Sequence, residues 1–313
     1  MSEYKWMLRR GSRKEVCPSC GKRRFVPYVL TADPSVAAGP EYGRCDREQS
    51  CGYFRYPGGD IKADAEQQAE RPFGDMKREP LLFAASETVE KAKVTAGNTL
   101  WKAYNKLLPA LYLLAAMRRY RIDTAPDGSC IYWQWDGTVN GVRTGKAIMY
   151  GSDGHRMKRD DGEALPVYWY HKLQKQEGKE LRQCFFGQHL LRMEDFRDLP
   201  VIVVEGEKTA VLMAAYELYI RSFSADHERH IYLACGGSQM LKGAIDLSCL
   251  FGRRVALVPD DGQWLNWDRT ANAYGWDCID IEELKIRTGQ PDGCDIWDCC
   301  ERRLKDNKKG GGR

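Results

Sequence analysis

Two short apolar runs, each followed by acidic residues, constrain the fold of this 313-residue chain more than any other feature. Residues 201–204 read VIVV and are followed at once by Glu205, and residues 255–258 read VALV and are followed, after a proline, by Asp260 and Asp261. Continuous runs of this kind are typical of strands buried on both faces of a parallel sheet. Helical periodicity follows the first run, so the pattern predicts an α/β sheet with carboxylates at the carboxyl ends of its strands.

These acidic ends predict a shared cleft, because the carboxyl ends of neighbouring parallel strands meet at one edge of a sheet. Carboxylate oxygens are the ligands that Mg²⁺ and Mn²⁺ take when they handle phosphates, so Glu205 and Asp260 are candidate ligands, with Asp261 as a further candidate. Lys208 begins the following helix against the helix dipole, which favours pairing with a carboxylate or a phosphate. A simple helix-terminal role for Glu205 and an exposed position for Lys208 are the alternatives.

Four cysteines near the amino end form two pairs. The first is Cys17 and Cys20 in CPSCG, and the second is Cys45 and Cys51 in CDREQSCG. Two pairs separated by about two dozen residues are typical of a closed Cys₄ zinc site that stabilises a small domain. Buried thiols or disulfides are the alternative. Residues 1–14 are polar and basic and contain no hydrophobic signal segment, which predicts a reducing, cytoplasmic compartment and disfavours disulfides.

Basic residues lie among aromatic residues in two regions, a combination that suits nucleic acid because cations meet phosphates and rings stack on bases. The candidate contacts are Arg23 and Arg24 near the cysteines, and Arg143, Lys146, Arg156, Lys158 and Arg159 in the middle of the chain. The net charge is only +4, so contacts with nucleic acid must come from local patches. A solvated surface or a protected hairpin edge explains the same residues. No run of eighteen apolar residues occurs, so no membrane span is predicted.

The chain resembles the Toprim family, the metal-binding fold of bacterial replicative primases, topoisomerases and some nucleases. The resemblance rests on VEGEK around Glu205, the small-residue turn CGGS at 235–238, and PDDG around Asp260. It implies that Glu205 is the first-motif glutamate and Asp260 the first aspartate of a DxD motif, whose second aspartate is replaced by Gly262. That replacement leaves enzymatic activity open. The segment DIWD beginning at Asp295 is similar to a late acidic motif of plasmid primases, and an N-cap role explains Asp295 equally well.

The resemblance extends over most of the chain. A zinc-ribbon pattern, a middle part containing VRTGK and QCFFGQHLL, and the Toprim-like motifs follow in the domain order of bacterial-type DNA primases, and look closest to primase-like proteins encoded on mobile, conjugative elements of Bacteroides-type bacteria. The predicted fold is an α/β Toprim core, a Rossmann-like parallel sheet, preceded by a small α+β module and an N-terminal zinc ribbon. The predicted divisions are a zinc ribbon at 1–59, a charged linker at 60–95, the α+β module at 96–190, the Toprim-like domain at 191–304 and a disordered tail at 305–313.

Three functions are compatible with this resemblance. The first is primer synthesis on single-stranded DNA, a nucleotidyl transfer from nucleoside triphosphates that uses Mg²⁺ or Mn²⁺, serves replication of a mobile element and involves a helicase or mobilisation protein. The second is an inactive protein that binds single-stranded nucleic acid and keeps a degenerate site. The third is a Toprim-type nuclease acting in defence. In the first, the catalytic residues are Glu205, Asp260, Asp261 and Lys208.

Overall fold

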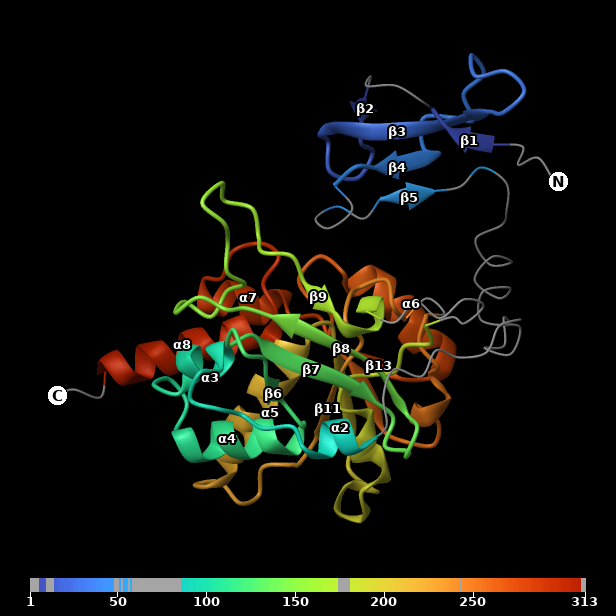
Figure 1. Ribbon diagram of the computed structural model, residues 1–313. Helices are drawn as coiled ribbons and strands as arrows, with labels where there is room; N and C mark the ends of the chain where they lie inside the picture. The colour runs from blue at the N-terminus through green and yellow to red at the C-terminus, as the bar shows by residue number, and fades with distance from the viewer. Residues whose placement is uncertain are drawn as a thin grey trace. The chain divides into compact units, whose positions relative to one another are not determined.

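The computed structural model describes most of the chain in two units (Figure 1). The described residues are 6–9, 14–47, 51, 53–55, 57, 86–173, 181–241 and 244–310. The units are Met1–Pro72 and Phe73–Arg313, and each is compact in itself. Most of the predicted linker and the last three residues of the predicted tail lie outside the described residues. None of the helices in the described ranges has the length and apolar character that a membrane span requires.

The first unit is a small antiparallel sheet. Its strands are β1 (Trp6–Leu8), β2 (Glu15–Val16), β3 (Arg23–Leu30), β4 (Gly43–Cys45) and β5 (Phe54–Arg55), in the order β1-β3-β4-β5 with β2 also paired to β3. The ring of Phe25 is fully buried and packs with Cys17 and Cys45 in a cluster of few residues. A core of this size buries little apolar surface, so the ribbon depends on additional cross-links for its stability.

The second unit begins with three short helices and an antiparallel sheet. The helices are α2 (Ser86–Glu90), α3 (Thr99–Tyr104) and α4 (Ala110–Arg119), and the sheet has the order β6 (Asp123–Thr124), β7 (Cys130–Trp135), β8 (Val142–Ile148) and β9 (Tyr168–Trp169). All six residues of β7 are buried. The reason is that a second cluster, which includes Val89 of α2 and Trp133, covers the face opposite the main core.

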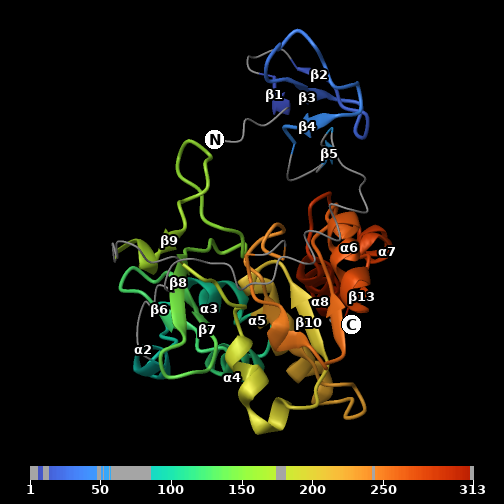
Figure 2. The same ribbon diagram turned by 90° about the vertical axis from the view of Figure 1, so that its right-hand side faces the viewer.

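A four-stranded parallel sheet forms the rest of this unit (Figure 2). Its order is β11 (Ile231–Ala234), β10 (Val201–Val204), β12 (Val255–Leu257) and β13 (Asp277–Cys278), and its helices are α5 (Glu207–Arg221), α6 (Trp264–Tyr274), α7 (Glu282–Thr288) and α8 (Ile296–Gly310). The 3-10 turns are η1 (Tyr170–Leu173), η2 (Gln188–Arg192), η3 (Glu194–Phe196) and η4 (Ser248–Leu250). The predicted buried strands β10 and β12 are direct parallel neighbours, so the prediction of an α/β parallel sheet is confirmed.

The antiparallel and parallel sheets share one hydrophobic core. Tyr120, which follows α4, donates its hydroxyl to the carbonyl of Tyr232 in β11 (2.7 Å), and its ring stacks on Phe186 at 5.4 Å. Phe186 in turn forms a bridge to the end of β11. The segments 96–190 and 191–304, predicted as separate domains, are therefore packed as one unit.

Two predicted irregular segments contain helix. Helix α2 lies within the predicted linker at 60–95, and α8 continues through residues 305–310 of the predicted tail. Ion pairs between side chains four residues apart stabilise the end of α8, at Glu301–Lys305 (2.8 Å) and Arg302–Asp306 (3.3 Å).

Candidate functional site: a cysteine cluster and an acidic edge

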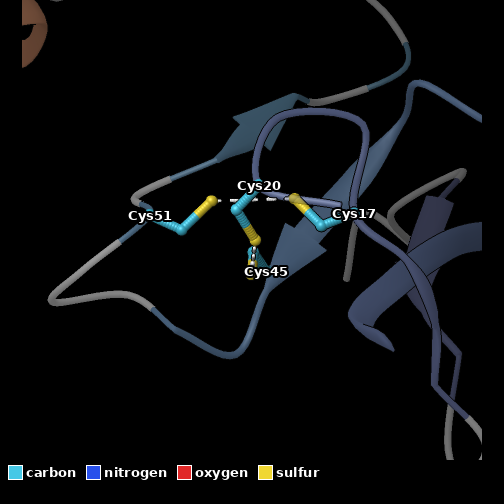
Figure 3. A group of neighbouring side chains, drawn as sticks. All are labelled: Cys17, Cys20, Cys45 and Cys51. Carbon is cyan, nitrogen blue, oxygen red and sulfur yellow. Dashed lines mark hydrogen bonds between the residues drawn. The ribbon is translucent and has the colours of Figure 1, made fainter. Parts of the chain in front are cut away.

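The four cysteines of the ribbon converge on one point (Figure 3). Their sulfurs all lie within 4.8 Å of one another, with Sγ–Sγ distances of 3.6 Å for Cys17–Cys51 and 4.0 Å for Cys20–Cys45. A tetrahedral zinc ion with Zn–S bonds of about 2.3 Å has sulfurs about 3.8 Å apart. The arrangement of the four sulfurs is therefore close to that of a tetrahedral zinc site.

Local backbone geometry brings the two pairs together. Gly21, at φ +66°, closes the turn after Cys20 and donates its N–H to the carbonyl of Cys17 (3.0 Å), a conformation that favours glycine. Cys45 ends β4, and the N–H of Cys51 donates to Arg47 (2.7 Å). Burial raises the pKa of the Cys45 thiol to about 12 and raises that of Cys51. Thiolates at such positions need a bound cation, as a structural zinc site provides.

Two carboxylates meet at the carboxyl edge of the parallel sheet. Glu205 directly follows β10, Asp260 follows β12, and the backbone N–H of Asp260 donates to Oε1 of Glu205 (3.3 Å). Glu205 is only 9% exposed. The structure thus brings together the two residues that the sequence predicts as divalent-cation ligands.

Burial makes this pair resist ionisation. It raises the pKa of Asp260 to about 9, with the nearby charge of Glu205 adding to the effect. It also raises the pKa of Glu205 to about 7, with a contribution from Asp295, although the N–H of Asp260 acts in the opposite direction. Because both shifts are upward, the pair retains a proton at neutral pH. A divalent cation at this position would favour the ionised forms.

Asp261 and Gly262 do not extend the pair formed by Glu205 and Asp260. The ammonium of Lys285 in α7 lies 3.1 Å from each carboxylate oxygen of Asp261, and the N–H of Gly293 donates to one of them (2.9 Å). Burial opposes ionisation of Asp261, but these partners outweigh it and lower its pKa. Gly262 has φ +81°, a conformation in which an aspartate would be strained. The structure therefore engages Asp261 in an ion pair instead of joining it to Glu205 and Asp260.

The start of α8 brings further carboxylates to this edge. Asp295 and Asp298 cap the helix reciprocally, since the N–H of each donates to the side chain of the other (3.0 and 2.9 Å). The hydroxyl of Thr209 in α5 donates to Asp295 (2.6 Å). The charges of both aspartates raise the pKa of Asp260, so they are part of the same electrostatic environment. We call Glu205, Asp260, Asp295 and Asp298 the acidic edge.

Asp298 is the last residue of the DIWD segment that the sequence relates to a late acidic motif, but it is not among the predicted site residues. The capping pattern that places an acidic residue three positions after an N-cap aspartate could have identified it.

Lys208 is influenced by the charges of the acidic edge. Burial alone would lower its pKa, but the charges of Asp295 and Asp298 outweigh burial and raise it. The ammonium group is therefore firmly charged. Among the residues that the structure describes, the four cysteines form a group in which all ligand atoms lie within 4.8 Å of one another. The carboxylates of the acidic edge do not form such a group, so they are more widely spaced.

Lys146 connects the antiparallel sheet to the start of α5. Its Nζ lies 2.7 Å from Oε2 of Glu207, and it also lies over the ring of Trp169 at 5.6 Å. The two side chains of the ion pair are 12% and 3% exposed. The predicted phosphate contact at Lys146 is occupied by an internal partner.

The other predicted basic residues divide into paired and exposed groups. Arg143 is ion-paired with Asp136 (2.7 Å). Exposed side chains are found at Arg156, Lys158 and Arg159, in the loop after β8, and at Arg23 and Arg24, at the start of β3. The loop is braced by bridges between positions 150 and 156 and between 158 and 164, and it projects from the second unit (Figures 1 and 2). These exposed cations are available to phosphates.

Comparison with known proteins gives two family matches. The profile of a family described as a domain of unknown function (DUF6371) matches residues 98–261, and the profile of a zinc beta-ribbon finger matches residues 4–66. No curated protein matches the chain. The ribbon match and the four converging cysteines together support a structural Zn²⁺.

The chain is similar in part to a solved structure of a bacterial protein. It is the RNA polymerase domain (RPD) of the primase DnaG of Mycobacterium tuberculosis, at 17% identity and a TM-score of 0.29, with 61% of this chain and 60% of that chain covered. The chain thus spans about three fifths of that structure's length. A likeness at this TM-score carries no argument about fold or activity.

Proposed function

We propose that this chain, which belongs to the family described as a domain of unknown function (DUF6371), is a primase-like protein. It binds single-stranded DNA and uses its acidic edge for nucleotidyl transfer that makes primers for replication of a mobile element. Its parallel sheet is a Toprim-type core. The observation that carries the proposal is the position of Glu205 and Asp260 at the ends of adjacent parallel strands, where the backbone N–H of Asp260 donates to Glu205 and burial raises the pKa of both carboxyls.

Charge decides which ligand suits this edge. Like charges so close together are stable only if they hold protons or a cation. Hard carboxylate oxygens suit Mg²⁺ or Mn²⁺, and Glu205 and Asp260 would hold such an ion. When bound, the ion supplies charge neutralisation for a triphosphate as pyrophosphate leaves the α-phosphorus. Asp295 and Asp298 add negative charge near the same position.

Lys208 is the cationic group of this chemistry. Because the neighbouring aspartates keep its ammonium charged, it can pair with a phosphate oxygen of the nucleotide. Lys146 acts indirectly: its ion pair with Glu207 fixes the first turn of α5, which begins two residues after Glu205. It is therefore a positioning residue.

The template contacts are assigned to the exposed cations. Arg156, Lys158 and Arg159 supply charge on the projecting loop, and Arg23 and Arg24 supply it on the ribbon. Such contacts give binding that falls with salt and has little sequence preference. A helicase or mobilisation protein is the expected replication partner.

The test is primer synthesis from labelled nucleoside triphosphates on single-stranded DNA with Mn²⁺. We expect short products from the wild-type chain and none from Glu205→Gln. The matched control is Glu228→Gln, whose exposed carboxylate pairs with Arg254 outside the acidic edge and whose products should be unchanged. Nicking of DNA without nucleotides would instead indicate the nuclease alternative.

A specific observation favours a second candidate, an inactive protein that binds single-stranded nucleic acid. Asp261 is held by Lys285, and Gly262 carries no carboxylate, so the turn after β12 offers Asp260 alone to the edge. Binding of single-stranded DNA without synthesis, under conditions where divalent cations also leave the thermal stability unchanged, would support this candidate over the first.

A further inference from the structure

A cavity of about 450 Å³ lies at the turn end of the β7–β8 hairpin. It is lined by side chains from the hairpin, from the segment 182–192 and from η4, and none of them belongs to the acidic edge. The residues that carry the argument are Asp136, Arg143, Arg182, Gln183, Gln188 and Arg192. The volume falls within the range of about 300 to 1,000 Å³ that is typical of small-molecule sites.

Three guanidinium groups line this cavity, and two of them, those of Arg143 and Arg192, hydrogen-bond to the same residue. Arg143 donates to Oδ2 of Asp136 (2.7 Å), and Nε of Arg192 donates to the carbonyl of the same residue (2.9 Å). Gly137, at φ +87°, permits this arrangement, because a Cβ there would lie 2.8 Å from Cδ of Arg192. A guanidinium has five N–H donors, so these contacts orient each group without using all of its donors.

The acceptors that line the cavity are largely engaged within the protein. Oδ1 of Asp136 accepts from the N–H and the hydroxyl of Thr138 (2.8 and 2.7 Å). Oε1 of Gln183 accepts from Gln134 (3.1 Å), and Oε1 of Gln188 accepts from a backbone N–H three residues earlier (3.1 Å). An amide whose oxygen is engaged offers its NH₂ group as a donor. The cavity therefore favours a ligand rich in acceptors.

We propose that this cavity binds the phosphate groups of a small, nucleotide-sized anion. Three arginines face two acids, Asp136 and Asp246, and Oδ1 of Asp246 is already occupied by the N–H of Ser248 (2.9 Å). Planar guanidinium forks match the geometry of phosphate oxygens. Because the donors are guanidinium and amide groups, binding requires no divalent cation. The site goes beyond the proposed function, since it is separate from the acidic edge.

The test is isothermal titration of the full-length, zinc-loaded chain with tripolyphosphate and with ATP, in buffer free of other divalent cations. We expect saturable binding of both probes. Arg192→Gln should weaken it about tenfold or more, because one charged donor is lost. Ser248→Glu should have a similar effect by placing a carboxylate at the cavity; Ser248 is exposed and begins η4, so this variant keeps the fold. The control Arg197→Gln, at an exposed arginine paired with Glu194, should bind normally.

Three results would overturn the proposal: no binding of either probe, equal affinity in all four proteins, or an effect of the variants on a thymidine oligonucleotide but not on ATP. The last result would mean that the cavity binds the phosphate backbone of a DNA strand and not a nucleotide-sized anion. Glu205→Gln separates this proposal from the proposed function, because it should abolish primer synthesis and leave cation-free ATP binding unchanged.

Discussion

The cysteine cluster and the acidic edge, which we propose as a second metal site, differ in how their ligand groups are arranged. The four cysteine sulfurs converge within 4.8 Å of one another, which is close to the spacing that zinc requires. Ionised carboxylates repel one another, and burial raises the pKa of both Glu205 and Asp260, so this pair retains a proton when no cation is bound. The difference teaches that the ribbon site is structural and closed, whereas the acidic edge, under the proposed function, is a site that a divalent cation would complete.

The largest expected effect is on the ribbon. Chelation of zinc or Cys17→Ser should unfold the first unit, because zinc binding supplies about 10 kcal/mol or more to domains of this kind and the ribbon core is small. The second unit should stay folded. Hydrogen exchange measured separately for the two units checks this.

Cys278→Ser is the matched control, since Cys278 is half-buried and lies outside the cluster. It should retain one zinc ion per chain by elemental analysis. Protein purified without chelators and free of zinc would contradict the structural role of the ribbon.

The next effect concerns the ion pair beside the acidic edge. Lys146→Met leaves Glu207 buried without its cation and should lower the free energy of unfolding by about 3 kcal/mol or more. Lys146→Met combined with Glu207→Leu should recover most of this loss, because no buried charge remains. Urea denaturation of the three variants measures the coupling. A double variant as unstable as the single one would show that the pair is not what stabilises this contact.

A smaller effect is the pH dependence created by Asp260. Its pKa is raised in the folded state, from an ordinary value of 3.8 to about 9, so its contribution to stability is fully present below about pH 4 and is lost as pH rises toward 9. Asp260→Asn should therefore stabilise the protein at pH 8, in the absence of divalent cations, by on the order of 2 kcal/mol.

The check is thermal unfolding of the wild type and of Asp260→Asn at several pH values between about 5 and 9. The melting curves of the Asp260→Asn variant and the wild type should approach each other at acid pH. Parallel curves across the whole range would mean that Asp260 is not a buried titrating group.

The smallest effect is on nucleic-acid binding. Changing Arg156, Lys158 and Arg159 together to glutamine should reduce the salt dependence of single-stranded DNA affinity by about two in log–log slope, since about 0.7 counterions are released per phosphate contact. Fluorescence anisotropy at several salt concentrations measures this. Arg143→Gln should change the slope little, because Arg143 is ion-paired to Asp136. An unchanged slope in the triple variant would remove the loop from the binding surface.

The ribbon was predictable because its information is local. Cys17, Cys20, Cys45 and Cys51 lie within one short segment, and their pairing pattern alone indicates a Cys₄ site. The strands β10 and β12 were predictable for a similar reason, since an unbroken apolar run identifies a buried strand.

Most other features of the candidate site depend on contacts between residues that are far apart in the sequence. The pair Lys146–Glu207 joins positions 61 residues apart, and the pair Asp261–Lys285 joins positions 24 apart. No spacing in the sequence indicates either one. Sequence reasoning therefore identified Lys146 and Asp261 as candidates for function by residue type, but the internal partners that occupy them became visible only in the fold.

The most direct test of the account is titration of the zinc-loaded chain with Mn²⁺ at pH 7, in buffers of different protonation enthalpy. We expect one weak site, at the millimolar end, with stronger binding of Mn²⁺ than of Mg²⁺ because Mg²⁺ demands stricter octahedral geometry. Binding should release a proton from the Glu205–Asp260 pair and should be lost in Glu205→Gln but kept in Glu228→Gln. Mn²⁺ binding that releases no proton, or that survives Glu205→Gln unchanged, would contradict the claim that these carboxylates form the cation site.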